Sequence, residues 1–229
     1  MKFLFLYFSL TAGFVQKYSY QFVDKFYNVY SCEEPHNDCL FYSGGNSKIP
    51  HEIYNSFLSE LASRNNRVCI VDPEFRDHYF HLKEMTHNRP TTMIAHSSGV
   101  NEALKALHYL DNVNKLVLID PVDSRLNNNG KEYNIPSYVK EVLIIYASKS
   151  YKWSFYPFKI PFIPAFGMKQ EKIISENKTI LNMEEYGHCD ILDYNWGKIM
   201  HETLSAGISE RNPLKIQNYH KELSNIISP

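Results

Sequence analysis

The sequence predicts an α/β domain with a mostly parallel central sheet flanked by helices. Short apolar runs with strand character alternate with segments of helical periodicity along most of the chain, and this alternation is typical of parallel strands joined by helical crossovers. The chain has 229 residues, so we expect residues 1–229 to form a single domain. Its hydrophobic content of 44% is ordinary for a globular protein, and its net charge of −1 gives no support to nucleic-acid binding.

Residues 1–13 have two interpretations. A lysine followed by an apolar run and then by Thr11-Ala12-Gly13 is similar to a short secretory signal with small residues at the cleavage point. The aromatic residues of the same run favour a first strand of the sheet equally well. The run is far too short to cross a bilayer as a helix. The sequence therefore leaves a cytoplasmic and a secreted location equally open, and it does not define the oligomeric state.

The remaining elements follow in chain order from residue 15. Residues 15–32 are rich in Tyr, Phe and Val and predict one or two antiparallel strands ahead of the main sheet. Buried strands are predicted from short apolar runs, and helices from apolar residues at helical spacing. The predicted strands are 39–42, 68–71, 91–95, 115–120, 142–147 and 178–183, and the predicted helices are 53–61, 100–110, 190–205 and 213–227.

The cysteines allow one disulfide. Cys32 and Cys39 flank a polar loop between two strand-like runs and could face each other. Sequence spacing alone does not establish the geometry that a disulfide requires. Cys69 lies inside an apolar strand, where a small buried side chain is the ordinary role of cysteine.

The segment Ala-His-Ser-Ser-Gly at residues 95–99 closes a strand-like run and leads directly into a helical pattern. This is the sequence form of a nucleophile elbow, in which a serine occupies a sharp strand-to-helix turn. Backbone packs against backbone in this turn, so the residues two before and two after the nucleophile must be small. Ala95 and Gly99 meet that requirement for Ser97, whereas Ser98 would be flanked by histidine and valine. The alternative is a strand that simply ends in a loop.

Paired glycines follow the predicted strand at 39–42. Gly44 and Gly45 let the backbone approach a bound group closely. In a site of the elbow type, one of them would donate its backbone N–H to the oxyanion, together with the N–H of Ser98. The alternative is an ordinary strand-to-helix turn.

A serine hydroxyl needs a base, and the base needs a third group to orient it. His188 follows the last predicted strand, and loops after parallel strands gather at one edge of the sheet, so it is the expected base. Asp120 ends the strand after the elbow and is the expected acid, with Asp123 as the second choice. The turn after the following strand, Tyr146 to Ser150, contains no carboxylate. No histidine cluster has the spacing of a metal site, so we expect no metal and no cofactor.

Two segments resemble the chlorophyllase branch of the α/β-hydrolases. They are Leu118–Asp123, with the pattern Leu-Ile-Asp-Pro-Val-Asp, and Gly187–Asp193, with the pattern Gly-His-Cys-Asp-Ile-Leu-Asp. The resemblance implies an α/β-hydrolase fold, an esterase activity and a catalytic triad of Ser97, Asp120 and His188. The chain departs from the family at the elbow, which usually reads Gly-His-Ser-Arg-Gly-Gly, and at the loop before Gly44, which usually begins with His-Gly. These departures leave the ester substrate open.

An aromatic segment at residues 151–166 follows the strand at 142–147, and its three prolines indicate an irregular loop. Its position places it near the catalytic edge, where Trp153, Phe155, Phe158 and Phe162 would line an apolar acyl or alcohol pocket. The alternative is packing against the body of the protein or against a partner. The sequence therefore predicts a serine hydrolase for a small, apolar ester. Other readings are a thioesterase or lipase with the same triad, and a catalytically silent hydrolase fold used for binding.

Overall fold

The structure is a computed structural model, and it describes most of the chain. The described residues are 5–7, 15–22, 25–72, 79–87, 89–123, 132–152, 154–155, 160–161, 167–197, 199 and 212–228. The single-domain expectation concerns the whole chain and stays a prediction.

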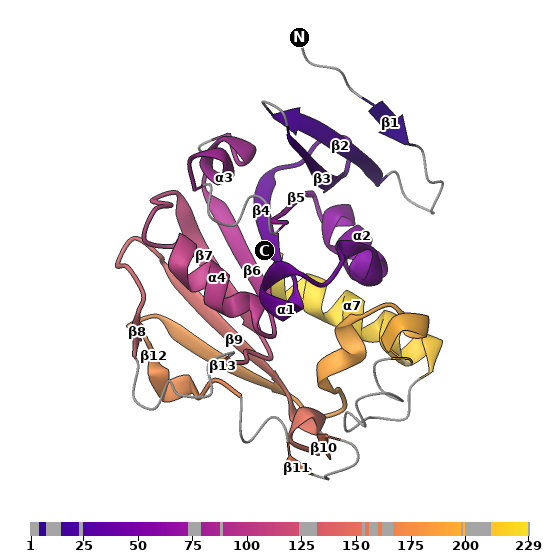
Figure 1. The fold of residues 1–229 in the computed structure, drawn as a ribbon, viewed down its shortest axis with the longest axis vertical. Coiled ribbons are helices and arrows are strands. Elements are labelled where there is room, and N and C mark those ends of the chain that lie inside the picture. The colour runs from indigo at the N-terminus through magenta and orange to yellow at the C-terminus, as the bar shows by residue number, and fades with distance from the viewer. Residues whose placement is uncertain are drawn as a thin grey trace.

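A central sheet organises the described residues (Figure 1). Its strands lie in the order β1-β2-β3-β5-β4-β6-β7-β9-β13, and the six from β5 to β13 run parallel to one another. The first three strands are antiparallel and extend one edge of the sheet. The bounds are β1 Phe5–Tyr7, β2 Gln16–Phe22, β3 Lys25–Ser31, β4 Asn37–Tyr42, β5 Asn66–Ile70, β6 Thr91–His96, β7 Val113–Ile119, β9 Glu141–Ala147 and β13 Lys178–Met183.

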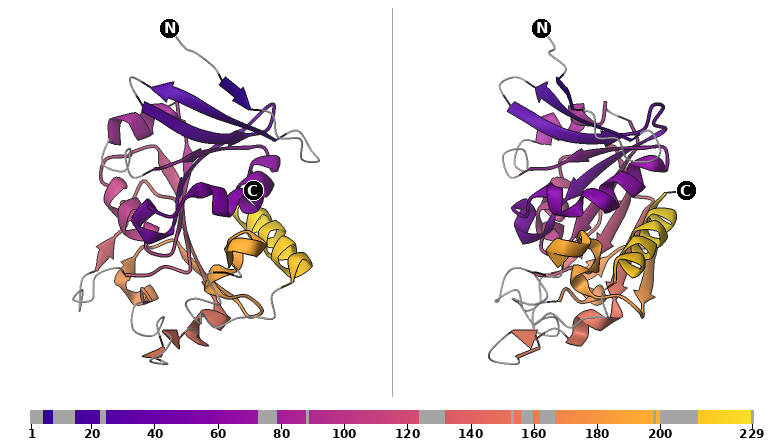
Figure 2. Two further views of the ribbon diagram at one scale, coloured as in Figure 1. Left: turned by 45° about the vertical axis from the view of Figure 1, so that its right-hand side comes forward. Right: turned by 90° about the vertical axis from the view of Figure 1, so that its right-hand side faces the viewer.

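Helices cover both faces of this sheet (Figure 2). On one face, α2 (Asn55–Ser63) and α7 (Pro213–Ile227) bury aromatic and aliphatic side chains against alternate residues of the parallel strands. On the other face, α3 (Tyr79–Met85) and α4 (Gly99–Ala106) pack against the remaining strand residues, whose side chains point to that side of the sheet. Because both faces are covered, the parallel strands are nearly continuous apolar runs, as the sequence indicated. The predicted mostly parallel sheet flanked by helices is confirmed.

The remaining elements are short and connect the strands. They are α1 (Gly44–Ser47) and four 3-10 turns, η1 (His51–Tyr54), η2 (Ser148–Lys152), η3 (Gln170–Lys172) and η4 (His188–Ile191). Two small pairs of strands lie outside the central sheet: β8 (Tyr133–Asn134) pairs with β12 (Ile173–Ile174), and β10 (Ser154–Phe155) pairs with β11 (Ile160–Pro161). No helix in the described part of the chain combines the length and the apolar character that a membrane span requires.

The two ends of the chain agree with the sequence patterns where they are described. Phe5–Tyr7 of the ambiguous first segment form β1, which pairs with β2. At the other end, α7 begins after Asn212, whose side chain accepts a hydrogen bond from the N–H of Lys215 at 2.7 Å, and Pro213 fills the first helical position. The helix predicted at 190–205 is replaced at its start by the 3-10 turn η4, residues 194–197 are helical, and most of its remainder lies outside the described residues.

The disulfide between Cys32 and Cys39 is not formed, and both cysteines are free. The reason is the order of the strands. Cys39 lies in β4 opposite Val68 of β5, while Cys32 directly follows β3, which pairs with the other side of β5. A whole strand therefore separates the two cysteines. Two strand spacings amount to roughly 9–10 Å, beyond the reach of a disulfide.

Candidate active site

The backbone of Ser97 makes the sharp turn between β6 and α4. Its φ of 55° is rare for a residue other than glycine, whereas Ser98 has an ordinary φ of −74°. Such strain is a feature of a nucleophile elbow. A Cβ atom added to Gly99 would lie 2.2 Å from the carbonyl oxygen of Ser43, so only glycine fits at this position. A small residue two positions after Ser97 is what the elbow pattern predicts.

The side chains of Ser97, His188 and Asp120 form one hydrogen-bonded array. His188 Nε2 lies 2.9 Å from Ser97 Oγ, and His188 Nδ1 lies 2.5 Å from Asp120 Oδ2. Asp120 and His188 are both buried. Because a carboxylate only accepts, His188 Nδ1 carries the proton, which leaves Nε2 to accept the proton of the serine. The structure thus brings together the three residues that the sequence singled out.

Two groups, one at the end of β9 and one in the turn η2 that follows it, fix the Asp120 carboxylate. The N–H of Ala147 donates to Oδ1 at 3.2 Å, and the hydroxyl of Ser150 donates to Oδ2 at 2.6 Å. Ser150 is fully buried. Sequence reasoning missed Ser150, because the turn after this strand was searched for a carboxylate only. The signal in the sequence was a serine in that same turn, whose hydroxyl can donate a hydrogen bond to the carboxylate.

Asp123, the second choice for the acid, has a different partner. Its Oδ2 atom lies 3.7 Å from Lys172 Nζ, and the carboxylate is buried. The structure therefore favours Asp120 as the partner of His188. The turn that separates the two aspartates begins at Asp120, whose φ of 45° directs the chain away from the strand.

The loop at residues 43–47, called here the glycine loop, lies against the elbow. The N–H of Asn46 donates to Ser98 Oγ at 3.1 Å, and a Cβ atom added to Gly44 would lie 3.4 Å from the Cβ of Ser97. The N–H of Gly44 donates to the hydroxyl of Tyr54 at 3.0 Å. Among the hydrogen bonds between described residues, none uses the N–H of Gly45 or of Ser98. Of the two glycines considered from the sequence, Gly45 is therefore the one with an available donor.

The loop that carries His188 is held by the two aspartates of its motif. Asp190 accepts a hydrogen bond from the N–H of Gly187 at 2.8 Å. Asp193 accepts from the N–H of Ser56, in the first turn of α2, at 2.8 Å. Carboxylates at helix starts are stabilised by the free N–H groups there. Asp190 thus holds the backbone just before His188, and Asp193 ties the same loop to the start of α2.

The proposed substrate residues fall mostly outside the described part of the chain. This holds for Trp153, Phe158 and Phe162, and for Phe155 only the backbone, in β10, is described. The aromatic pocket stays a prediction.

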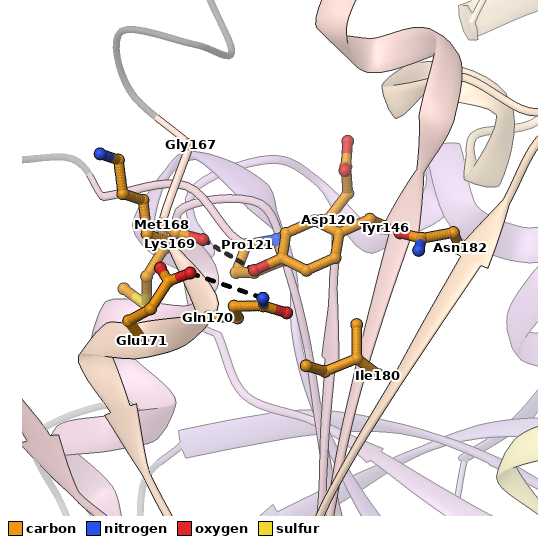
Figure 3. A pocket seen from close by; sticks show the side chains of 10 residues that line it. All are labelled: Asp120, Pro121, Tyr146, Gly167, Met168, Lys169, Gln170, Glu171, Ile180 and Asn182. Atoms are coloured by element: carbon orange, nitrogen blue, oxygen red, sulfur yellow. Dashed lines mark hydrogen bonds between the residues drawn. The ribbon is translucent and has the colours of Figure 1, made fainter.

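A cavity of about 640 Å³ opens beside Asp120 (Figure 3). Its lining combines polar and apolar side chains, and Tyr146 donates a hydrogen bond across it to the carbonyl oxygen of Met168 at 2.9 Å. Neither Ser97 nor His188 is among the lining residues, which are Asp120, Pro121, Tyr146, Gly167, Met168, Lys169, Gln170, Glu171, Ile180 and Asn182. Within the described residues, no three His, Cys, Asp or Glu side chains are grouped so that they could hold a metal ion.

The sequence matches no protein-family model, and it has no significant match among curated proteins. Solved structures do match. A hormone-sensitive lipase from a metagenome library gives a TM-score of 0.57 at 12% identity, over 96% of this chain and 87% of that one. A sugar hydrolase from Lactococcus lactis gives 0.55 at 11% identity, over 92% and 96%.

A ferulic acid esterase from Streptomyces cinnamoneus gives a TM-score of 0.54 at 14% identity, over 84% of this chain. The chain spans about two thirds of that esterase, 66% of its length. At such low identity these similarities concern the fold alone. The chain has the α/β-hydrolase fold.

Proposed function

We propose that this protein is a serine hydrolase that cleaves carboxylic esters through an acyl-enzyme. The observation that carries the proposal is the hydrogen-bonded array of Ser97, His188 and Asp120 at the carboxyl edge of the parallel strands, in which His188 and Asp120 are buried. The sequence predicts the same three residues from their order and their position after strands. The esterases and lipases among the structural neighbours support an ester as the bond that is cleaved.

Each residue has a definite task in this reaction. Ser97 Oγ attacks the carbonyl carbon of the ester while His188 Nε2 removes its proton, and Asp120 stabilises the imidazolium that forms. The N–H groups of Gly45 and Ser98 donate to the oxyanion of the tetrahedral intermediate. The protonated His188 then gives its proton to the departing alcohol. Water, activated by His188 in turn, hydrolyses the acyl-enzyme and restores the serine.

A fluorophosphonate probe tests this proposal directly, because it reacts with an activated serine and ignores an inert one. We expect the purified protein to be labelled, and mass spectrometry to locate the adduct on Ser97. Heat-denatured protein is the control and should not react. Absence of labelling would favour the alternative, a catalytically silent hydrolase fold used for binding. A pair of substrates with the same acyl group, one an oxygen ester and one a thioester, separates an esterase from a thioesterase.

We further propose a chlorophyllase-like preference for apolar esters, based on the resemblance at Leu118–Asp123 and Gly187–Asp193 and on the aromatic segment at 151–166. Each buried methylene contributes about 0.8 kcal/mol, so kcat/KM should rise with chain length in a series of p-nitrophenyl esters. Replacing Trp153 and Phe155 together by alanine should flatten this rise more than it lowers hydrolysis of the acetate.

The matched control for this series is Trp196→Ala. This tryptophan lies outside the aromatic segment and is 50% exposed, so the variant should keep the wild-type profile. A chain-length profile that is unchanged in the double variant would assign the aromatic segment to packing or to a partner surface.

A further inference from the structure

A chain of hydrogen bonds joins the glycine loop to the backbone of His188. The N–H of Gly44 donates to Tyr54 Oη at 3.0 Å, Tyr54 Oη lies 2.9 Å from His96 Nδ1, and His96 Nε2 lies 3.1 Å from the carbonyl oxygen of His188. Tyr54 is 0% and His96 2% exposed, so solvent does not compete for these bonds. The four residues come from four separate segments of the chain, namely α1, η1, the end of β6 and η4.

The donor and the acceptor of each hydrogen bond in this series follow from the groups at its two ends, the N–H of Gly44 and the carbonyl oxygen of His188. The carbonyl oxygen of His188 can only accept, so His96 Nε2 carries a proton. Burial holds the pKa of His96 well below its usual range, and the neighbouring His188 lowers it further, so the ring is neutral and Nδ1 is an acceptor. The hydroxyl of Tyr54 must then donate to Nδ1, and its oxygen accepts from Gly44. Hydrogen bonds aligned head to tail in this way strengthen one another.

This series of hydrogen bonds ends at the backbone of His188 and includes His96, the residue before Ser97. Gly44 precedes Gly45, the proposed oxyanion donor, and His188 is the proposed base. His96 lies between them, with its ring centroid 4.8 Å from that of His188. Catalysis needs the oxyanion donor and the base on opposite sides of Ser97 Oγ at fixed distances, and errors of about 1 Å there lower rates by roughly a hundredfold.

We propose that Tyr54 and His96 are positioning residues that hold the glycine loop and His188 at a fixed separation around Ser97. This inference rests on the proposed function. Neither residue touches the substrate. Tyr54 acts through the backbone N–H of Gly44, the neighbour of Gly45. His96 acts through the backbone carbonyl oxygen of His188. A neutral His96 also keeps a second positive charge away from the imidazolium that forms on His188.

Tyr54→Phe tests the proposal with the smallest change. The variant keeps the aromatic packing on Phe41, whose ring centroid lies 5.2 Å away, but leaves Gly44 and His96 without their shared partner. We expect kcat for p-nitrophenyl butyrate to fall by roughly 10- to 100-fold, with KM changing by less than about threefold, because alignment is lost and binding is not.

Tyr30→Phe is the matched control. Tyr30 belongs to the same core, is 1% exposed, and donates to Asn55 Oδ1 at 3.1 Å, so this variant also loses one hydroxyl and one hydrogen bond. Its kcat should stay within roughly twofold of wild type. Thermal unfolding of both variants shows whether they lose similar stability. An equal kcat for Tyr54→Phe and Tyr30→Phe would overturn the inference.

A second pair of variants addresses His96. A glutamine can offer an N–H to the carbonyl oxygen of His188, whereas a leucine cannot, so His96→Gln should retain a larger kcat than His96→Leu. Equal losses at equal thermal stability would contradict a positioning role. Fluorophosphonate labelling of the wild-type protein distinguishes a failure of the proposed function from a failure of the positioning inference alone. Unlabelled Ser97 overturns the proposed function and this inference with it, while normal labelling confines a failure to the positioning residues.

Discussion

Ser97→Ala is expected to lower kcat for ester hydrolysis by roughly six orders of magnitude. The variant loses the hydroxyl oxygen that lies 2.9 Å from His188 Nε2, so no acyl-enzyme can form. The fold should be preserved, since a smaller side chain adds no contact at a turn whose φ is already strained. Steady-state hydrolysis of p-nitrophenyl butyrate measures the loss, and circular dichroism checks the fold.

Ser98→Ala is the control that tests the register of the elbow. Ser98 contributes its backbone N–H, which the substitution keeps, and its hydroxyl only accepts a hydrogen bond from Asn46 at 3.1 Å. Losing one hydrogen bond of about 1 kcal/mol corresponds to roughly a fivefold effect. An inactive Ser98→Ala beside an active Ser97→Ala would show that the nucleophile had been assigned to the wrong serine.

The fold could be predicted because its signals are local. Each parallel strand is an apolar run covered on both faces, and each amphipathic helix shows its buried side at helical spacing. The elbow was predictable for a similar reason, since the need for glycine at residue 99 comes from backbone contact within one turn. Side chains that follow successive parallel strands meet at one edge, so the order of the strands in the sequence predicts that His188 lies near Ser97.

Features that depend on the spatial order of strands were not predictable. The sequence left a disulfide between Cys32 and Cys39 open, and the structure excludes it because β5 lies between β3 and β4, an order that no local pattern reports. Ser150 and Tyr54 were missed because a lone hydroxyl or a buried tyrosine has no pattern of its own. Their importance comes from a partner in another segment of the chain. Ser150 donates to Asp120, and Tyr54 accepts from Gly44.

Asp120→Asn is expected to lower kcat by roughly four orders of magnitude, and the structure gives the reason. The N–H of Ala147 points at Oδ1, so the oxygen of the new amide must take that position. The amide NH₂ then faces His188 Nδ1 and Ser150 Oγ. A histidine that accepts at Nδ1 carries its proton on Nε2, where it cannot remove the proton of Ser97. The substitution should therefore change the tautomer of His188 while leaving its position unchanged.

Two measurements separate this explanation from a general loss of stability. Nitrogen-15 NMR of the imidazole should report a protonated Nδ1 in the wild-type protein and a protonated Nε2 in Asp120→Asn. Asp123→Asn is the control: Asp123 lies near Lys172, whereas the carboxylate at His188 Nδ1 is that of Asp120, so the substitution should change kcat by less than roughly tenfold. A larger loss in Asp123→Asn than in Asp120→Asn would move the acid to Asp123. An unchanged tautomer in Asp120→Asn, together with a large loss of kcat, would mean that the charge of Asp120 matters more than the orientation it imposes.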